Sequence, residues 1–167
     1  MFTESGLYGE LTIPGKMKEI YKEIQVSASI SDVWNAFTTA EGIKTFFAPD
    51  AKIELWLGGA YEIYFYPPEN AGSRGSEGCN VLSFIPEKML SFTWNAPPEF
   101  PNVRNERTWV VLEFEDFKDN TVLVRLTHLG WKEGKEWDEV YNYFDSAWGV
   151  VLNRLKKRFE EGPVKWD

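Results

Sequence analysis

The chain has 167 residues, of which 43% are hydrophobic and 26% charged, and its formal net charge is −8. This length fits one domain around a single core, and the composition excludes a disordered chain. The acidic balance disfavours nucleic acid and anionic membranes as partners, because a phosphate backbone is bound by a basic patch.

The N-terminal part of the chain divides into an extension and the start of a domain. Residues 1–18 are rich in Gly, Glu and Thr, and we interpret them as an extension in which residues 7–13 form a candidate edge strand. From residue 20 to 26, apolar and polar side chains alternate, which predicts a first strand. We therefore expect a single domain over residues 19–162, followed by a tail at 163–167.

Two capping boxes follow the first strand. Ser29 stands three residues before Asp32, and Thr38 stands three residues before Glu41. In such a box the first side chain accepts a hydrogen bond from a backbone N–H of the first helical turn. The spacing predicts two short helices, which are marginal alone and need packing against the rest of the domain.

A two-residue period recurs from residue 52 to 128. It predicts further strands near 61–65, 79–85, 90–94, 110–115 and 122–128, with long loops at 67–78 and 95–107. Glu62, Glu113 and Glu115 fall on the outer face by this alternation, whereas His128 points inward. Strands that follow one another in this way favour an antiparallel sheet with one apolar face.

The last predicted element is a long helix over residues 136–160, in which apolar residues recur at steps of three and four. Gly162 and Pro163 end it. One apolar sheet face and one long amphipathic helix can bury each other, so the sequence predicts an α+β domain. We expect a curved antiparallel sheet of about six to seven strands around the C-terminal helix, with two short helices after the first strand.

The order of these elements and their motifs resemble the helix-grip fold of the START/SRPBCC superfamily. Within it, the chain is most similar to the family named after the activator of heat-shock-protein-90 ATPase homologue (its C-terminal-type domain). The segments that carry the resemblance are Val26 to Thr38, Phe46-Phe47-Ala48-Pro49, Gly58-Gly59-x-Tyr61-x-Ile63, Pro86 to Trp94, Thr121 to His128 and Ala147 to Leu155. Ala147 departs from the family, which often has Gly before the Trp of the last helix.

The resemblance implies a deep cavity between the sheet and the last helix. Members of the superfamily bind lipids, sterols, polyketides or other hydrophobic molecules, some are cyclases or aromatases, and some bind chaperones. A fold shared by several functions does not choose among them.

Aromatic residues make up 16% of the chain, with eight Trp and twelve Phe. Large rings either fill a core or line a cavity for an apolar ligand, and the sequence leaves both open. The predicted ligand cavity consists of Phe37, Phe46, Tyr61, Ile63, Phe65, Phe92, Trp94, Val110, Leu112, Leu126, His128, Phe144 and Trp148.

His128 is a candidate for acid–base catalysis, because an imidazole inside an apolar cavity can transfer a proton. No inward carboxylate accompanies it, so a structural or ligand-contacting role is favoured and we predict no catalytic residue. Cys79 has no activating base in the sequence and is interpreted as a small buried hydrophobe. Arg74, Arg104 and Arg107 lie in or beside the two long loops, where they either remain solvated or guard the mouth of a pocket.

The chain has one cysteine and one histidine, which limits the disulfides and metal sites that it can form. Cys79 is the only cysteine, which excludes an intramolecular disulfide and is typical of a reducing compartment. One His and one Cys do not form a usual zinc site, and we predict no metal and no cofactor. The first residues lack a signal-peptide pattern, and no apolar run approaches the ~20 residues of a membrane span, so we expect a cytoplasmic protein.

Three functions remain in order of preference. The first is non-enzymatic binding of a small hydrophobic or aromatic molecule, such as a lipid, sterol, polyketide or flavonoid-like compound. A stress-related role is compatible with such binding. The second is a chaperone cofactor or other protein-interaction module that uses outward aromatics, with Trp56, Tyr64, Tyr66 and Trp131 as candidates. The third is a cyclase, aromatase or hydratase-type enzyme that uses His128.

Overall fold

The computed structural model describes residues 17–167, so the candidate edge strand at 7–13 lies outside the described residues. In chain order the elements are β1 (Ile20–Ser27), α1 (Ile30–Thr38), α2 (Ala40–Lys44), β2 (Asp50–Ile53), β3 (Tyr61–Tyr64), β4 (Val81–Ile85), β5 (Met89–Trp94), β6 (Thr108–Phe117), β7 (Thr121–Leu129) and α3 (Lys135–Glu161). Each predicted strand and helix from residue 20 onward has a counterpart in this order.

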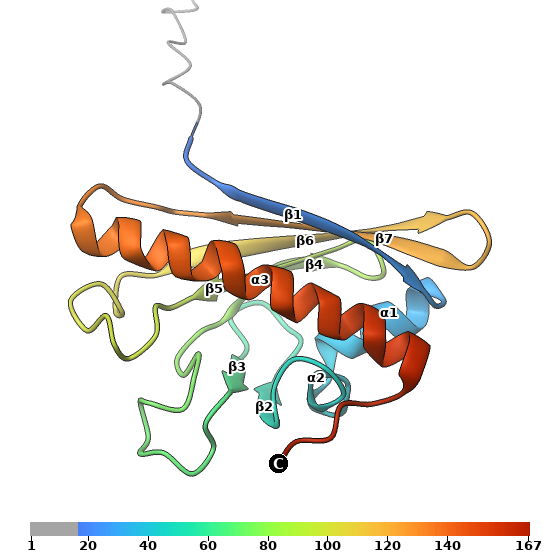
Figure 1. The fold of residues 1–167 in the computed structure, drawn as a ribbon, viewed down its shortest axis with the longest axis horizontal. Coiled ribbons are helices and arrows are strands. Elements are labelled where there is room, and N and C mark those ends of the chain that lie inside the picture. The colour runs from blue at the N-terminus through green and yellow to red at the C-terminus, as the bar shows by residue number, and fades with distance from the viewer. Residues whose placement is uncertain (1–16) are drawn as a thin grey trace, which may run out of the picture.

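The strands form a five-stranded antiparallel sheet in the order β1-β7-β6-β5-β4 and a two-stranded sheet of β2 and β3. Backbone hydrogen bonds join the two sheets, since Tyr61 donates to the Cys79 carbonyl and Val81 donates to the Gly59 carbonyl, both at 2.8 Å. Helix α3 lies across one face of the larger sheet, while β2, β3, α1 and α2 gather below it (Figure 1). The predicted α+β class, with an antiparallel sheet and a long C-terminal helix, is confirmed.

Cross-strand pairs on the inner face of the sheet explain where the core lies. In the register of β6 and β7, Val110 faces His128 and Leu112 faces Leu126, and Leu90 of β5 faces Leu112. All five side chains are at most 1% exposed. Because side chains alternate across a strand, this register places the apolar set of three strands beneath α3.

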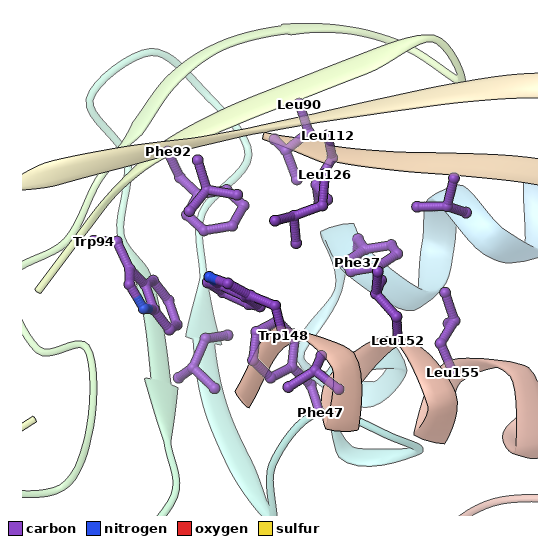
Figure 2. Close-up of a cluster of buried hydrophobic side chains, with 14 of the residues drawn as sticks. Phe37, Phe47, Leu90, Phe92, Trp94, Leu112, Leu126, Trp148, Leu152 and Leu155 are labelled. Carbon is purple, nitrogen blue, oxygen red and sulfur yellow. The ribbon is translucent and has the colours of Figure 1, made fainter. Parts of the chain in front are cut away.

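Helix α3 presents the predicted apolar stripe to this face (Figure 2). Its buried residues are Trp137, Val140, Phe144, Trp148, Val151, Leu152 and Leu155. Gly162 ends the helix with φ at 101°, a backbone conformation that glycine adopts without the steric penalty of a side chain. No helix within residues 17–167 combines the length and apolarity that a membrane span needs.

The two short helices are capped, but the second cap is not where the sequence placed it. Ser29 Oγ accepts from a first-turn backbone N–H of α1, as predicted. The prediction that Thr38 caps α2 is wrong by one residue, because Thr39 Oγ1 accepts from the Gly42 N–H at 2.9 Å. Thr38 still belongs to α1, and its hydroxyl donates back to the Trp34 carbonyl at 2.8 Å.

A buried tyrosine fastens β3 to α1. Tyr61 is fully buried, and its hydroxyl donates to the Phe37 carbonyl at 2.8 Å. That carbonyl lies in the last turn of α1, where no intrahelical N–H is available to satisfy it. The hydrogen bond therefore satisfies two buried polar groups at once.

Replacing Tyr61 by Phe is expected to lower the free energy of unfolding by about 1–3 kcal/mol, because it leaves the buried Phe37 carbonyl without its hydrogen-bond donor. Urea unfolding followed by tryptophan fluorescence measures the change. Tyr64→Phe is the matched control, since the Tyr64 hydroxyl donates to Glu62 in a half-buried position and its loss is expected to change stability less. Equal effects of the two substitutions would contradict the role given to Tyr61.

Candidate functional site

A cleft of about 800 Å³ opens beside the middle of α3. Its walls come from α3, from the turn after α2, and from the two long loops that follow β3 and β5. The deep wall consists of Phe47, Phe65, Trp94 and Trp148, and the rim includes Tyr66, Pro97, Pro98 and Tyr143. The two loops that the sequence singled out thus meet at one opening.

The deep wall is one connected group of four rings. The ring centroids of Trp94 and Trp148 are 5.3 Å apart, and Phe47 lies 6.0 Å from each of them. Phe65 meets Trp94 edge to face at 6.3 Å. Figure 2 shows Trp94 entering from β5, Trp148 from α3 and Phe47 from the turn below the helix. Phe65 follows β3, so four separate segments supply the four rings, and packing of the fold holds the wall in shape.

His128 holds the Trp148 ring in place. Its Nδ1 accepts a hydrogen bond from Trp148 Nε1 at 2.9 Å, so the proton of the neutral imidazole is on Nε2. That Nε2 lies 2.7 Å from Thr108 Oγ1 and donates to it. Thr108 in turn donates to the Trp94 carbonyl at 3.4 Å. Both ring nitrogens are therefore occupied by side chains of α3 and β6.

Burial lowers the pKa of His128 from 6.5 to about 3. The imidazole is fully buried among rings, including Phe144 at 5.2 Å and Trp131 at 4.4 Å between centroids. The Nε2 proton and the Nδ1 lone pair of this neutral histidine are both engaged by other side chains, so neither is free for the proton transfer of acid–base catalysis. The structure gives His128 a positioning role.

Four of the thirteen predicted cavity residues line the cleft: Phe65, Trp94, Phe144 and Trp148. The other nine pack in the core beneath it: Phe37, Phe46, Tyr61, Ile63, Phe92, Val110, Leu112, Leu126 and His128. The sequence missed Phe47, although it stands beside the predicted Phe46. Adjacent aromatic residues in a short helix and turn give no periodicity that separates a wall position from a core position.

Arg104 lies at the cleft, but its guanidinium is already used. It donates to the Gly75 carbonyl at 2.8 Å and also to the carbonyls of Gly72 and Ala96. Glu77 lies 4.0 Å away and supplies opposite charge. Since these partners belong to both long loops, Arg104 joins the two sides of the mouth.

The other two candidate arginines do not line the cleft. Arg74 donates to the Glu69 carbonyl, and Arg107 donates to the carbonyls of Glu77 and Arg104. All three arginines therefore bind loop carbonyls. Of these three loop arginines, only Arg104 lines the cleft.

Glu77 orders the loop after β3 from within. Its carboxylate accepts hydrogen bonds from the backbone N–H groups of Gly72, Arg74 and Gly75, the last two at 2.6 and 2.9 Å. At Gly75 a Cβ would stand 1.9 Å from the Ile63 carbonyl, so only glycine allows this close approach to β3. The loop is thereby fixed against the strand that precedes it.

The C-terminal residues close one side of the cleft. Val164 donates its N–H to the Thr45 carbonyl at 2.9 Å, and Trp166 Nε1 donates to the Lys44 carbonyl at 2.6 Å. The guanidinium of Arg154 lies 5.4 Å over the Trp166 ring. These contacts place Arg154 and Trp166 in the cleft wall.

One polar atom of the deep wall is unpaired. Trp94 is 2% exposed, and its Nε1 is buried without a hydrogen-bond acceptor among residues 17–167. Most buried donors in folded proteins have a partner, so this one requires an explanation.

Neither metal nor thiol chemistry gains support from the described residues. Within 17–167 there is no group of three or more His, Cys, Asp or Glu side chains placed to hold a metal ion. Cys79 is fully buried, and burial raises the pKa of its thiol to about 11. Because the thiolate is the nucleophile, the predicted reading of Cys79 as a buried apolar residue agrees with its surroundings.

The candidate partner-binding aromatics differ in exposure. Trp56 and Tyr66 are exposed, and Leu57 beside Trp56 is 71% exposed. Tyr64 and Trp131 are half-buried, and both are tied down by hydrogen bonds, Tyr64 to Glu62 and Trp131 to the His128 carbonyl. Of these four candidates, only Trp56 and Tyr66 have exposed rings.

Comparison with known families finds one match that spans most of the chain. The model of the family described as Activator of Hsp90 ATPase homolog 1-like protein matches residues 27–160. No curated protein sequence matches the chain.

Solved structures share the fold at low sequence identity. Protein MLL2253 from Mesorhizobium loti is 20% identical, with a TM-score of 0.69 over 88% of this chain and 100% of that one. The Aha1 dimer from Colwellia psychrerythraea is 24% identical, with a TM-score of 0.66 over 87% and 98%. DynU16, a protein in the dynemicin biosynthetic locus, is 16% identical, with a TM-score of 0.63 over 87% of this chain and 48% of that one. At these identities the likeness shows the fold alone.

Because the folded chain holds His128 neutral, its stability is expected to fall as the pH drops from about 6.5 towards 3. In that window the unfolded chain binds a proton that the folded chain excludes, with a slope of up to ~1.4 kcal/mol per pH unit. Urea unfolding at about pH 7 and about pH 5.5 measures the loss.

His128→Gln removes the titrating group and is expected to flatten this pH dependence, while lowering stability at neutral pH. His128 is the only histidine in the chain, so its imidazole resonances in an NMR titration are unambiguous. Titration of the folded protein with a pKa near the ordinary value of 6.5 would contradict the burial of the imidazole.

Proposed function

The chain belongs to the Activator of Hsp90 ATPase homolog 1-like family, and we propose that it binds a small, largely apolar, aromatic molecule in the cleft beside α3. The observation that carries the proposal is the open volume of about 800 Å³ against a wall of four rings. Cavities for small ligands typically measure roughly 300–1,000 Å³ and are lined mainly by apolar and aromatic side chains. A filled core would leave no such space.

The shape of the wall favours a flat ligand. Rings prefer offset-stacked or edge-to-face contacts, and the half-buried Phe65 and the exposed Tyr66 and Tyr143 line the cleft and offer both. Pro97 and Pro98 at the rim add rigid apolar surface without ordering cost. Binding a planar aromatic molecule would bury this surface from water.

The chemistry of the wall supports binding over catalysis. His128 is absent from the cleft lining, and its nitrogens are engaged with Trp148 and Thr108. Among the titratable groups that line the cleft, Arg104 is bound to loop carbonyls. A cyclase, aromatase or hydratase that uses His128 would need an imidazole facing the substrate.

A second candidate function rests on a separate surface. Trp56 and Leu57, in the turn between β2 and β3, are 57% and 71% exposed. Exposed tryptophan is enriched at the energetic centres of protein interfaces, and the family takes its description from an activator of a chaperone ATPase. This pair is the surface through which the chain would contact a chaperone.

Filling the cleft is expected to abolish ligand binding without unfolding the protein. Ala147 is half-buried in the cleft wall, so Ala147→Phe places a ring in the open volume. The probe is N-phenyl-1-naphthylamine, an uncharged aromatic fluorophore that brightens in apolar surroundings. We expect saturable binding to the wild type and an affinity at least tenfold lower for Ala147→Phe.

Asn153→Phe is the matched control, because Asn153 is exposed on the same helix and is absent from the cleft lining. It adds the same ring to α3 and is expected to leave probe affinity unchanged. Circular dichroism verifies that both variants fold. Failure of the wild type to bind the probe, or equal binding by the folded Ala147→Phe variant, would remove the proposal.

The chaperone candidate is tested with a purified Hsp90-type chaperone and isothermal titration calorimetry. Replacing both Trp56 and Leu57 by Ser is expected to weaken binding at least tenfold, since it removes the exposed apolar pair. Tyr21→Ser is the control, because Tyr21 is an exposed aromatic residue on β1 in the other sheet. No heat of binding from the wild type, with nucleotide present, would exclude this candidate.

A further inference from the structure

We infer that the segment after α3, residues 163–167, is a strap that docks on α2 to complete the cleft, and that Trp166 is its contact with a bound ligand. The inference rests on the proposed function, because it concerns how that same cleft is closed around its ligand. It gives a conformational role to a segment that the sequence predicted only as a tail.

The chain turns back at the end of α3. Gly162 has φ at 101° and Pro163 follows it, so the helix does not continue in its own direction. In Figure 1 the segment after α3, drawn in dark red, runs back beneath the helix towards α2. Val164 and Trp166 are half-buried there, whereas Lys165 between them is exposed. Two alternate side chains of the strap therefore pack against the protein.

The end of α2 holds the strap. Val164 donates its N–H to the Thr45 carbonyl at 2.9 Å, and Trp166 Nε1 donates to the Lys44 carbonyl at 2.6 Å. Carbonyls at the end of a helix have no intrahelical donor, so the strap satisfies two groups that α2 cannot satisfy itself. Phe47 of the deep wall stands two residues after Thr45 in the chain. Docking of the strap therefore also steadies the turn that carries Phe47.

Trp166 brings the strap to the cleft. Its ring lines the cleft together with Arg154, whose guanidinium lies 5.4 Å over the ring. This contact is attractive because the face of an indole is electron-rich, and it connects the strap to α3 as well as to α2. Trp166 is half-buried and not fully buried. Since the ring keeps accessible surface and lines the cleft, an aromatic molecule in the cleft can contact it.

The strap is the part of the cleft wall with the weakest anchorage. Trp94 and Trp148 belong to β5 and α3, whereas residues 163–167 form neither helix nor strand. Segments that lie outside regular structure and make few buried contacts open locally at a lower free energy than core strands and helices. We therefore expect the strap to undock while the rest of the domain stays folded.

Docking of the strap and binding of the ligand are then coupled. A ligand that contacts Trp166 binds the docked state better than the undocked state, so it shifts the strap towards docking. By linkage, docking raises the affinity for the ligand by the same factor that the ligand raises docking. This reciprocity makes the strap measurable from either side.

Hydrogen exchange of the Val164 amide, followed by NMR, reports docking because this N–H donates to the Thr45 carbonyl. We expect N-phenyl-1-naphthylamine, at about a hundred times its Kd, to slow this exchange at least tenfold. The control is the Lys88 amide, which donates to the Ile85 carbonyl in a turn outside the cleft lining. Its exchange is expected to stay unchanged.

Trp166→Ala removes both the ring and the indole donor of the strap. We expect it to lower the affinity for N-phenyl-1-naphthylamine at least tenfold. Lys165→Ala is the matched control, because Lys165 is the exposed neighbour in the same strap, and the affinity is expected to stay unchanged. Thermal unfolding verifies that both variants are folded before titration.

The outcomes separate this inference from the proposed function. If the wild type binds the probe but the exchange of the Val164 amide does not change, or if Trp166→Ala binds as tightly as the wild type, the inference is overturned and the cleft remains a ligand site. Failure of the probe to bind the wild type overturns the proposed function and the inference together.

Discussion

The hydrogen bond from Trp148 to His128 connects the long helix to the centre of the sheet, and the cleft depends on it. Trp148 belongs to α3, His128 to β7, and Thr108 of β6 completes the chain of contacts. This chain fixes the angle of the Trp148 ring, which is part of the deep wall. Burial keeps the imidazole neutral and these bonds engage both of its nitrogens, so its role is to position a ring and not to move protons. The one histidine of the sequence thereby shapes the proposed binding site without lining the cleft itself.

An open cleft in a small domain has a physical cost, which the surrounding contacts offset. Apolar walls that face a void or water lack the packing contacts of a filled core. Around this cleft the two long loops are joined by Arg104, and the loop after β3 is ordered by Glu77. The C-terminal residues add a further side through Trp166. These polar contacts maintain the opening, and a ligand would supply the missing apolar contacts.

Much of the fold could be predicted from the sequence because burial imposes periodicity. The alternation through residues 110–128 identified the inner face, and it placed His128 inside correctly. The capping box at Ser29 located α1, whereas Thr38 and Thr39 are chemically alike, and only backbone conformation decides which of them caps α2. The seven strands within residues 17–167 match the expected number, but their division into two sheets depends on turns that periodicity does not describe.

The site was less predictable than the fold. Alternation tells which side chains face inward but not whether another ring fills the space before them, so nine of the predicted cavity residues proved to be packed core. Arg104 was singled out by its place in a loop, but its partners are main-chain carbonyls, which every residue carries and which leave no signal in the sequence. Trp94 Nε1 is unpaired because no hydrogen-bond acceptor among residues 17–167 reaches it, and only a three-dimensional structure can reveal this.

The most direct test of the central claim, that the ring-lined cleft is a ligand site, is a proton–nitrogen NMR titration of the indole N–H signals with N-phenyl-1-naphthylamine. The account predicts saturable shifts of the Trp94 and Trp148 signals, whose rings line the cleft, while the signal of Trp56, exposed in the turn between β2 and β3, stays in place. A titration that leaves Trp94 and Trp148 unmoved, or that shifts Trp56 alone, would contradict it.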